Sequence, residues 1–334
     1  MQPTLLEHLR CPACRQRLRA ASDDRLECQG GHTYAVRDGV PRFTGEITRT
    51  AESFGYMWGE QAERVVPPET VWPYHLHAML QALAAPPLHG LILDAGCGEG
   101  IDLAMVALDP ACEIVGVELS DGGVRTSLAR TRGLLRAQLV QADLLNLPIA
   151  DGTFDGAYSY GVVHHTADPP RAVREIARTM KPGAPLLLYV YEDFSDRPWR
   201  WRAALALANS ARHLTTRLSP AVLMRWCRWL SPVVYTLCTL PARHFRWAAR
   251  FPYRHGTTPW GLSGDLYDRL SAPIEERYSR EGATRLAVQA GLEVVAVAQQ
   301  RGWMVYARQP LAAAGAGSRD VIEPDRPMSR CEAN

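Results

Sequence analysis

Lysine is nearly missing from this sequence, since Lys181 is the only lysine among its 37 basic side chains. Arginine therefore carries almost all of the positive charge, which we attribute to a compositional bias of the genome rather than to a functional choice. The formal net charge is only +2, so the overall charge predicts no particular partner. A length of 334 residues is sufficient for one large domain and a small one.

Features of exported and membrane-spanning proteins are also missing. The first residues lack the basic region, apolar core and small-residue cleavage site of a secretory signal. Five of the eight cysteines are scattered along the chain, which does not indicate a disulfide framework. The apolar stretch 221–240 contains Arg225, Arg228 and Pro232, which argue against a transmembrane helix. We therefore expect a cytoplasmic protein.

The strongest motif is LILDAGCGEG at residues 91–100. Its first four residues, ending in Asp94, indicate a short buried strand, and a helix is expected to begin near Glu99. Between them lie Gly96, Gly98 and Gly100, which allow a sharp turn and a close approach of the backbone to a ligand. A strand, a glycine-rich turn and a helix are typical of a nucleotide-binding α/β unit.

An acidic residue follows each of the next two predicted strands. Glu118 ends the run 113–117, 24 residues after Asp94, and Asp143 ends the run 138–142. An acid at the end of the second strand is placed to accept the hydroxyls of a ribose. No phosphate-binding GK[ST] follows the glycines. The pattern therefore favours a ligand that has a ribose but no polyphosphate.

This pattern resembles the class I S-adenosylmethionine (SAM) dependent methyltransferases, whose first motif is an acid followed by GxGxG. The resemblance covers roughly residues 53–195 and 265–308. It implies that residues 94–100 hold the methionine end of SAM, that Glu118 binds the ribose, and that Asp143 binds the adenine amino group. We include Leu119, Leu144 and Tyr160 in the expected cofactor site.

The first 43 residues have the pattern of a small metal-binding module. Cys11 and Cys14 form a CPAC turn, and Cys28 and His32 can complete a tetrahedral zinc site. Such a module is too small to bury a core of its own, so the metal would supply most of its folding energy. The alternative is three buried cysteines and a surface histidine.

The sequence of this module resembles known zinc ribbons. It is similar to the ribbon proteins that partner tRNA methyltransferases, and its ligand set is similar to that of bacterial rRNA guanine methyltransferases. Similar ribbons also precede many small-molecule methyltransferases, so the ribbon does not determine the substrate.

The methyl acceptor is expected at the carboxyl ends of the strands. The residues expected to rim this site are Tyr160, His164, His165, Tyr189, Tyr191 and Glu192. His164 or His165 could deprotonate an acceptor hydroxyl, with Tyr160 beside them. Methyl transfer depends mainly on in-line positioning, however, so a purely structural role for both histidines remains an alternative. The resemblance implies that the aromatic segment SFGYMWGEQ covers SAM, with Phe54, Tyr56 and Trp58 as candidates; the alternative is that these aromatics simply pack on the core.

The segment 197–264 is unusual in its composition. It contains eleven arginines, six of the nine tryptophans, and no aspartate or glutamate. The simplest interpretation is a helical cap whose tryptophans pack and whose arginines are solvated. The alternatives are a segment that contacts a membrane surface or lipid-like acceptor, or one that binds RNA or another polyanion.

We therefore expect an α/β fold, a doubly wound Rossmann-like methyltransferase sheet with an N-terminal zinc ribbon and an inserted helical cap. The expected divisions are a ribbon (1–43), a linker with lid helices (44–90), the SAM-binding core (91–196), the cap (197–264), the rest of the core (265–309) and a disordered tail (310–334).

The expected activity is transfer of the SAM methyl group to an O, N or C atom of a small natural-product or lipid-like acceptor. The alternatives are an RNA base methyltransferase that binds RNA through its ribbon and cap, and a SAM-sensing subunit without activity. The expected cofactors are SAM and Zn²⁺, and the sequence leaves the oligomeric state open.

Overall fold

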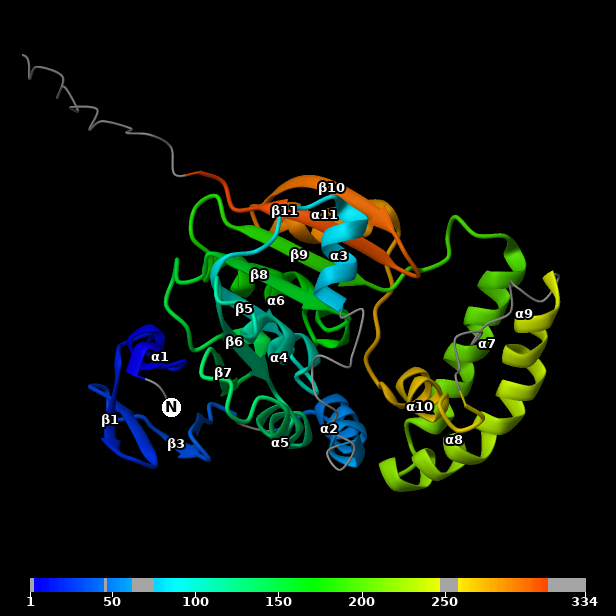
Figure 1. The fold of residues 1–334 in the computed structure, drawn as a ribbon, viewed down its shortest axis with the longest axis horizontal. Coiled ribbons are helices and arrows are strands. Elements are labelled where there is room, and N and C mark those ends of the chain that lie inside the picture. Colours follow the sequence, from blue (N-terminus) through cyan, green and yellow to red (C-terminus); the bar gives the residue numbers. More distant parts are fainter. Residues whose placement is uncertain (1–2, 45–46, 62–74, 247–257, 312–334) are drawn as a thin grey trace, which may run out of the picture.

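The computed structural model describes residues 3–44, 47–61, 75–246 and 258–311 (Figure 1). Parts of the predicted linker, cap and tail lie outside the described residues, namely 45–46, 62–74, 247–257 and 312–334. The prediction of a disordered tail therefore concerns residues that the structure does not describe, apart from 310 and 311.

A seven-stranded mixed sheet forms the centre of the molecule. In spatial order its strands are β10 (Glu293–Gln299), β11 (Trp303–Arg308), β9 (Pro185–Val190), β8 (Gly156–Tyr160), β5 (Gly90–Ala95), β6 (Cys112–Glu118) and β7 (Ala137–Gln141). The pairs from β9 to β7 are parallel, whereas β11 runs antiparallel to both of its neighbours. The predicted α/β fold is confirmed, and β10 and β11 close the sheet as an antiparallel pair.

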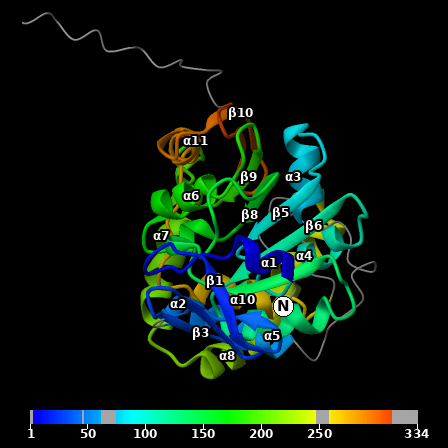
Figure 2. The same ribbon diagram turned by 90° about the vertical axis from the view of Figure 1, so that its left-hand side faces the viewer.

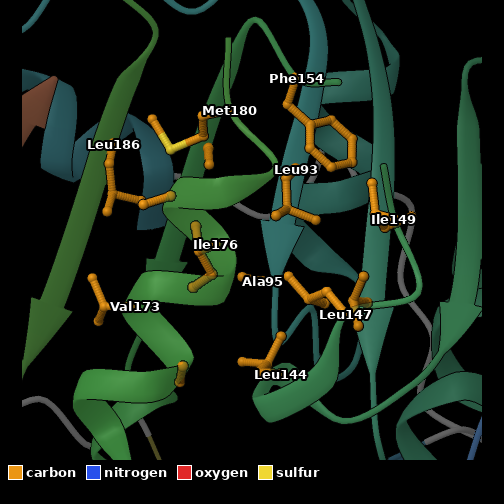
Figure 3. Close-up of a cluster of buried hydrophobic side chains, with 14 of the residues drawn as sticks. Leu93, Ala95, Leu144, Leu147, Ile149, Phe154, Val173, Ile176, Met180 and Leu186 are labelled. Atoms are coloured by element: carbon orange, nitrogen blue, oxygen red, sulfur yellow. The ribbon is translucent and has the colours of Figure 1, made fainter. Parts of the chain in front are cut away.

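Helices cover both faces of this sheet (Figure 2). One face packs against α3 (His75–Leu83), α4 (Ile101–Ala107) and α5 (Asp121–Arg130), and the other against α6 (Pro169–Arg178) and α11 (Arg280–Gln289). Side chains alternate along a strand, so Ile92 and Leu93 of β5 enter different cores. Figure 3 shows the core on the side of α6, where Leu93 lies near Ile176.

Helices α5 and α6 each begin with a side-chain cap. The Ser120 side chain accepts a hydrogen bond from the Gly123 N–H at the start of α5. Asp168 accepts one from the Arg171 N–H at 2.9 Å, at the start of α6. Each cap satisfies a backbone donor that has no partner within its own helix.

The amino-terminal module is a small antiparallel sheet docked on the main sheet. It comprises α1 (Pro3–His8), β1 (Leu18–Ser22), β2 (Arg25–Cys28), β3 (Thr33–Arg37) and β4 (Val40–Pro41). Leu5 and Leu9 are almost fully buried and belong to the same core as Leu93. The Arg10 N–H also donates to the Pro148 carbonyl at 2.8 Å. The module therefore shares the core of the main domain.

A helical segment follows β9 and lies beside the sheet, on the side away from the amino-terminal module (Figure 1). It contains α7 (Trp199–Thr215), α8 (Pro220–Val234), a π-helical turn (Tyr235–Thr239), α9 (Leu240–His244) and α10 (Ser263–Ser271). Within the described residues, no helix has both the length and the apolar character needed to cross a membrane.

The predicted end of the cap at residue 264 falls inside α10. Leu266 and Tyr267 of this helix pack in one buried cluster with Leu223 and Met224 of α8, and with Met57 of α2 (Arg49–Gln61). By its packing, α10 therefore belongs to the helical segment rather than to the sheet that follows.

Candidate active site

A cavity of about 530 Å³ opens at the carboxyl ends of the parallel strands. Its volume is in the range of sites for small molecules and cofactors. Most of the predicted cofactor residues line it: Asp94, Gly96, Gly98, Glu118, Leu119, Asp143, Leu144 and Tyr160. The fold thus brings the ends of four strands to one cavity, as predicted for a doubly wound sheet.

The glycine-rich turn fits closely against its neighbours. Gly96 has a φ of +90°, and a Cβ at this position would lie 2.4 Å from a methyl group of Val162. Gly100 does not line the cavity, because it packs against Ser127 of α5, where a Cβ would come within 2.9 Å of the backbone. Its glycine therefore allows α4 and α5 to approach each other, whereas Gly96 and Gly98 face the cavity.

Glu118 is held in place by the turn that it faces. Its carboxylate accepts hydrogen bonds from the Gly98 N–H at 3.1 Å and from the Ser120 N–H at 2.8 Å. The Ser120 hydroxyl donates a third bond at 2.7 Å. These donors fix the orientation of the carboxylate in the cavity wall.

Asp143 begins the short 3₁₀ helix Leu144–Asn146, and its side chain accepts a hydrogen bond from the Leu145 N–H at 2.9 Å. Asp143, Leu144 and Leu145 all line the cavity. The backbone of this loop therefore forms the wall at the end of β7.

The aromatic segment near residue 54 forms the helix α2 above the glycine turn. Phe54 and Trp58 line the cavity, whereas Tyr56 packs against Tyr267 with ring centroids 6.4 Å apart. The close approach of α2 to α5 depends on Gly122, since a Cβ there would lie 1.7 Å from the Gly55 carbonyl oxygen.

His75 lines the cavity although no sequence motif indicates it. Its Nδ1 lies 2.9 Å from a carboxylate oxygen of Asp102, and its ring stacks on Tyr160 with a centroid distance of 4.1 Å. Burial alone would lower the pKa of His75, but the Asp102 carboxylate outweighs this effect and raises it. Tyr160, at the end of β8, is thereby held between His75 and Tyr189.

The two predicted catalytic histidines have different positions. His165 lines the cavity, and its Nδ1 donates a hydrogen bond to the Ile274 carbonyl at 2.8 Å. Because a carbonyl only accepts, this bond places the proton on Nδ1 and leaves Nε2 with a lone pair. Burial lowers the pKa of His165, so the ring is neutral. His164 is fully buried behind it and does not line the cavity.

Asp268 of α10 is a second residue that lines the cavity without a sequence signal. The Tyr191 hydroxyl donates to its carboxylate at 3.2 Å, and both residues line the cavity. Burial raises the pKa of Asp268. The predicted rim residues Tyr189 and Glu192 do not line the cavity. Tyr189 stacks on Tyr160, and Glu192 forms an ion pair with Arg197 at 3.1 Å.

The amino-terminal module brings its predicted metal ligands together. One ligand atom from each of Cys11, Cys14, Cys28 and His32 lies within 4.8 Å of all the others. Cys14 Sγ is 3.6 Å from Cys28 Sγ, and Cys28 Sγ is 3.4 Å from His32 Nδ1. Zinc–sulfur bonds of about 2.3 Å place two tetrahedral thiolate ligands about 3.8 Å apart. The cluster therefore has the chemistry and the spacing of a zinc site.

Comparison with known families identifies the main domain. Residues 93–188 match the family described as "Methyltransferase domain". The core of this chain is a class I SAM-dependent methyltransferase domain. The matched segment begins within β5 and ends within β9, so it contains the glycine turn, Glu118, Asp143 and His165.

Curated relatives of this methyltransferase domain act on different acceptors. Norajmaline N-methyltransferase of Rauvolfia serpentina is 34% identical over 204 residues, which are 60% of this chain and 64% of the relative. 24-methylenesterol C-methyltransferase 2 of Oryza sativa subsp. japonica is 34% identical over 119 residues, covering 35% of this chain and 32% of the relative. A tRNA (carboxymethyluridine(34)-5-O)-methyltransferase of Arabidopsis thaliana is 32% identical over 123 residues, with coverages of 36% and 28%. The chain spans less than two thirds of each of these relatives.

The charges of the cavity fit the cationic groups of SAM. Burial raises the pKa of Asp94 far above its usual range, and the nearby Asp102 carboxylate raises it further. Burial also raises the pKa of Glu118. For Asp94, an ionised carboxylate is therefore unfavourable until a positive group approaches. SAM carries an ammonium and a sulfonium, so the methyltransferase domain offers acidic residues of the appropriate kind.

Proposed function

We propose that this chain transfers the methyl group of SAM to a hydroxyl or amine of a small, largely apolar acceptor. The observation that carries this proposal is the composition of the single cavity described above. Asp94, Glu118 and Asp143 lie toward the glycine turn, whereas Phe54, Met57 and Ile274 supply an apolar wall next to His165 and Asp268. The same space thus contains a cofactor side and an acceptor side.

On the cofactor side, we assign the residues as the sequence predicted. Asp94, Gly96 and Gly98 hold the methionine end of SAM, Glu118 accepts from the ribose hydroxyls, and Asp143 with Leu144 contacts the adenine. Glu118 is suited to this role because Gly98 and Ser120 orient its carboxylate, so binding requires little reorganisation. Leu119 and Tyr160 complete the walls.

On the acceptor side, His165 is the best candidate for the general base. When bound, SAM supplies an electrophilic methyl group on a sulfonium. The chain must align the acceptor atom and receive its proton. The Nε2 of His165 would carry the lone pair for this step. That atom is itself buried and forms no hydrogen bond with a described group, so the acceptor would have to reach it past the atoms that cover it. We do not assign His164 a proton-transfer role, since it is closed off from the cavity. We do not assign one to Tyr160 either, because burial raises the pKa of its hydroxyl.

Asp268 and Tyr191 select a polar group on the acceptor. The carboxyl group of Asp268 is enclosed by cavity walls, and Tyr191 donates to one of its oxygens. An acceptor hydroxyl or amine that donates to Asp268 would be directed toward His165. A hydrocarbon lacking such a group would leave a buried carboxyl unpaired, which costs free energy.

We also propose that Cys11, Cys14, Cys28 and His32 hold a structural Zn²⁺. The four ligand atoms converge as a tetrahedral site requires, and four protein ligands leave no open coordination position. The ion would stabilise the small sheet and take no part in methyl transfer.

The competing function is methylation of an RNA base, which the tRNA-modifying relative favours. The test uses SAM carrying a labelled methyl group, with purified protein and an extract of the host. Label in an organic-soluble fraction that resists nuclease and protease is the expected result. Label that becomes soluble only after nuclease treatment would refute the small-molecule acceptor. A His165→Asn variant, which should transfer little label, controls for other methyltransferases in the extract.

A further inference from the structure

The helix α8 exposes an apolar stripe to solvent. Val222, Trp226, Trp229 and Val233 recur every three or four residues and therefore lie on one side of the helix. Their side chains are 39%, 68%, 78% and 50% exposed. Leu223, Met224 and Cys227, on the other side, are buried against α10 and α2. The helix thus has one apolar face inside the protein and a second outside it.

The neighbouring helix α7 shows the same property more strongly, since none of its 17 residues is buried. Trp199, Leu207 and Leu214 recur about every two turns along one side, and their exposed fractions are 79%, 74% and 66%. An exposed apolar side chain is common on its own. Tryptophans and leucines repeated on two consecutive helices leave apolar faces suited to contact with an apolar partner.

The charged residues of the segment 197–264 have only one sign. The segment 197–264 has no acidic residue, and Arg200, Arg202, Arg217 and Arg225 are exposed. Other arginines of the segment pair with acids that lie outside it, as Arg228 does with Glu60 at 2.7 Å. The apolar stripes are therefore bordered by arginines that the described acids do not neutralise.

We propose that α7 and α8 form a docking surface for an anionic lipid bilayer. Tryptophan is suited to the boundary between headgroups and acyl chains, and each nearby arginine attracts anionic headgroups. No described helix can cross the bilayer, so these helices would lie in its interface as amphipathic helices do. A polyanion such as RNA would account for the arginines but not for the exposed leucines and valines.

Docking would bring the acceptor side of the cavity close to the lipid. Helix α10 packs on α8 and contributes Asp268 to the cavity wall. This consequence, unlike the docking itself, rests on the proposed function. It favours a lipid-soluble acceptor that enters the cavity from the membrane.

The test measures vesicle flotation of the full chain without SAM or any acceptor, so it is independent of methyl transfer. We expect binding to phosphatidylcholine vesicles that contain phosphatidylglycerol, with weaker binding to phosphatidylcholine alone and at high salt. Tryptophan emission should shift to shorter wavelength on binding. Failure of the wild-type chain to float with anionic vesicles at low salt would overturn the proposal.

Matched variants locate the surface. Leu207→Ser with Trp229→Ser should weaken flotation about tenfold or more, whereas Leu135→Ser, at an 81% exposed leucine outside the segment, should not.

A second pair of variants tests the charges. Arg217→Gln with Arg225→Gln should weaken flotation about tenfold or more, and Arg280→Gln with Arg285→Gln on α11 should change it little. Equal losses of vesicle binding in a variant and its control would contradict the assignment of this surface. The assignment would also be contradicted if Trp229 formed the interface of a dimer and that dimer did not bind vesicles. Unchanged circular dichroism shows that each variant is folded.

Discussion

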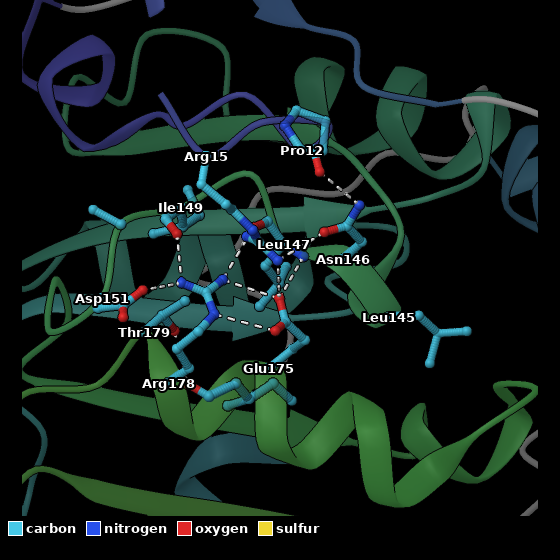
Figure 4. Close-up of polar contacts among 12 residues, drawn as sticks. Pro12, Arg15, Leu145, Asn146, Leu147, Ile149, Asp151, Glu175, Arg178 and Thr179 are labelled. Atoms are coloured by element: carbon cyan, nitrogen blue, oxygen red, sulfur yellow. Dashed lines mark hydrogen bonds and ion pairs between the residues drawn. The ribbon is translucent and has the colours of Figure 1, made fainter. Parts of the chain in front are cut away.

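Arg15, the residue after Cys14, donates a hydrogen bond to the Leu147 carbonyl at 2.8 Å (Figure 4). The same guanidinium reaches the Asn146 side-chain oxygen at 2.8 Å, and Asn146 donates back to the Pro12 carbonyl at 3.2 Å. Asn146 ends the short helix that begins after Asp143. The turn that bears two of the predicted metal ligands is therefore joined directly to the loop that lines the cavity at the end of β7.

This connection predicts that Arg15 supports cofactor binding from outside the cavity. Arg15→Gln should weaken SAM binding about three- to tenfold, because two hydrogen bonds that hold the loop are lost. Titration calorimetry measures this affinity. Arg19→Gln is the control, because Arg19 pairs with Glu27 inside the amino-terminal module and does not contact the loop. Equal affinities for both variants would show that the loop keeps its position without Arg15.

Metal binding predicts a spectroscopic signature. Cobalt(II) added to protein freed of metal should produce the intense absorption of tetrahedral thiolate coordination. Cys28→Ser should reduce the thiolate band, and His32→Ala should change the ligand-field bands. Cys238→Ser is the control, since Cys238 lies in the π-helical turn after α8. A wild-type protein that shows no such bands would contradict the zinc assignment.

Replacement of His165 tests the general base. His165→Asn should lower kcat about 100-fold or more and leave SAM affinity nearly unchanged, because proton acceptance is lost while the cofactor side is intact. Since burial lowers the pKa of His165, the wild-type rate should stay level as the pH falls through about 6.5, the usual value for histidine. A kcat that decreases less than threefold in the variant would leave positioning as the only role of this residue.

His164 predicts how stability depends on pH. Both of its ring nitrogens are buried without a hydrogen-bond partner, and burial holds its pKa well below the usual value. Below pH 6.5 the unfolded chain binds a proton at His164 that the folded chain does not. This residue therefore makes the protein less stable as the pH is lowered. Each pH unit below that point changes the free energy of unfolding by up to about 1.4 kcal/mol.

The measurement compares the wild-type chain with His164→Phe, so that contributions from other groups cancel. The variant should gain stability relative to wild type between pH 6.5 and 5, as followed by urea unfolding. A difference that is constant over this range would show that His164 takes up a proton as readily in the folded protein as in the unfolded chain.

Sequence patterns predicted the cavity residues at the strand ends better than those that reach the cavity from helices. Asp94, Glu118 and Asp143 each end a strand, and parallel strands bring their carboxyl ends to one edge, so a one-dimensional pattern suffices to place them. His75 and Asp268 reach the cavity from α3 and α10, through packing between helices that no short motif encodes. The predicted boundary inside α10 failed for the same reason, since Leu266 and Tyr267 belong to the helical segment only through tertiary contacts.

The amino-terminal module shows a related difference. Its ligands were predicted from their spacing, and the structure brings them together. Their spacing says nothing of how the module packs on the rest of the chain, where Leu5 and Leu9 fill a hydrophobic core that they share with the main sheet. What Leu5 and Leu9 pack against depends on the folded main sheet, so the sequence of the module alone does not predict it.

The central claim is that the cavity at the strand ends binds SAM through Glu118. Calorimetric titration of the purified chain with SAM, repeated for Glu118→Ala and for Glu113→Ala, an exposed residue of the same strand, tests it most directly. The account predicts one SAM per chain, an affinity at least about tenfold weaker in Glu118→Ala, and no change in Glu113→Ala. Binding that is absent in wild type, or equally strong in Glu118→Ala, would contradict it.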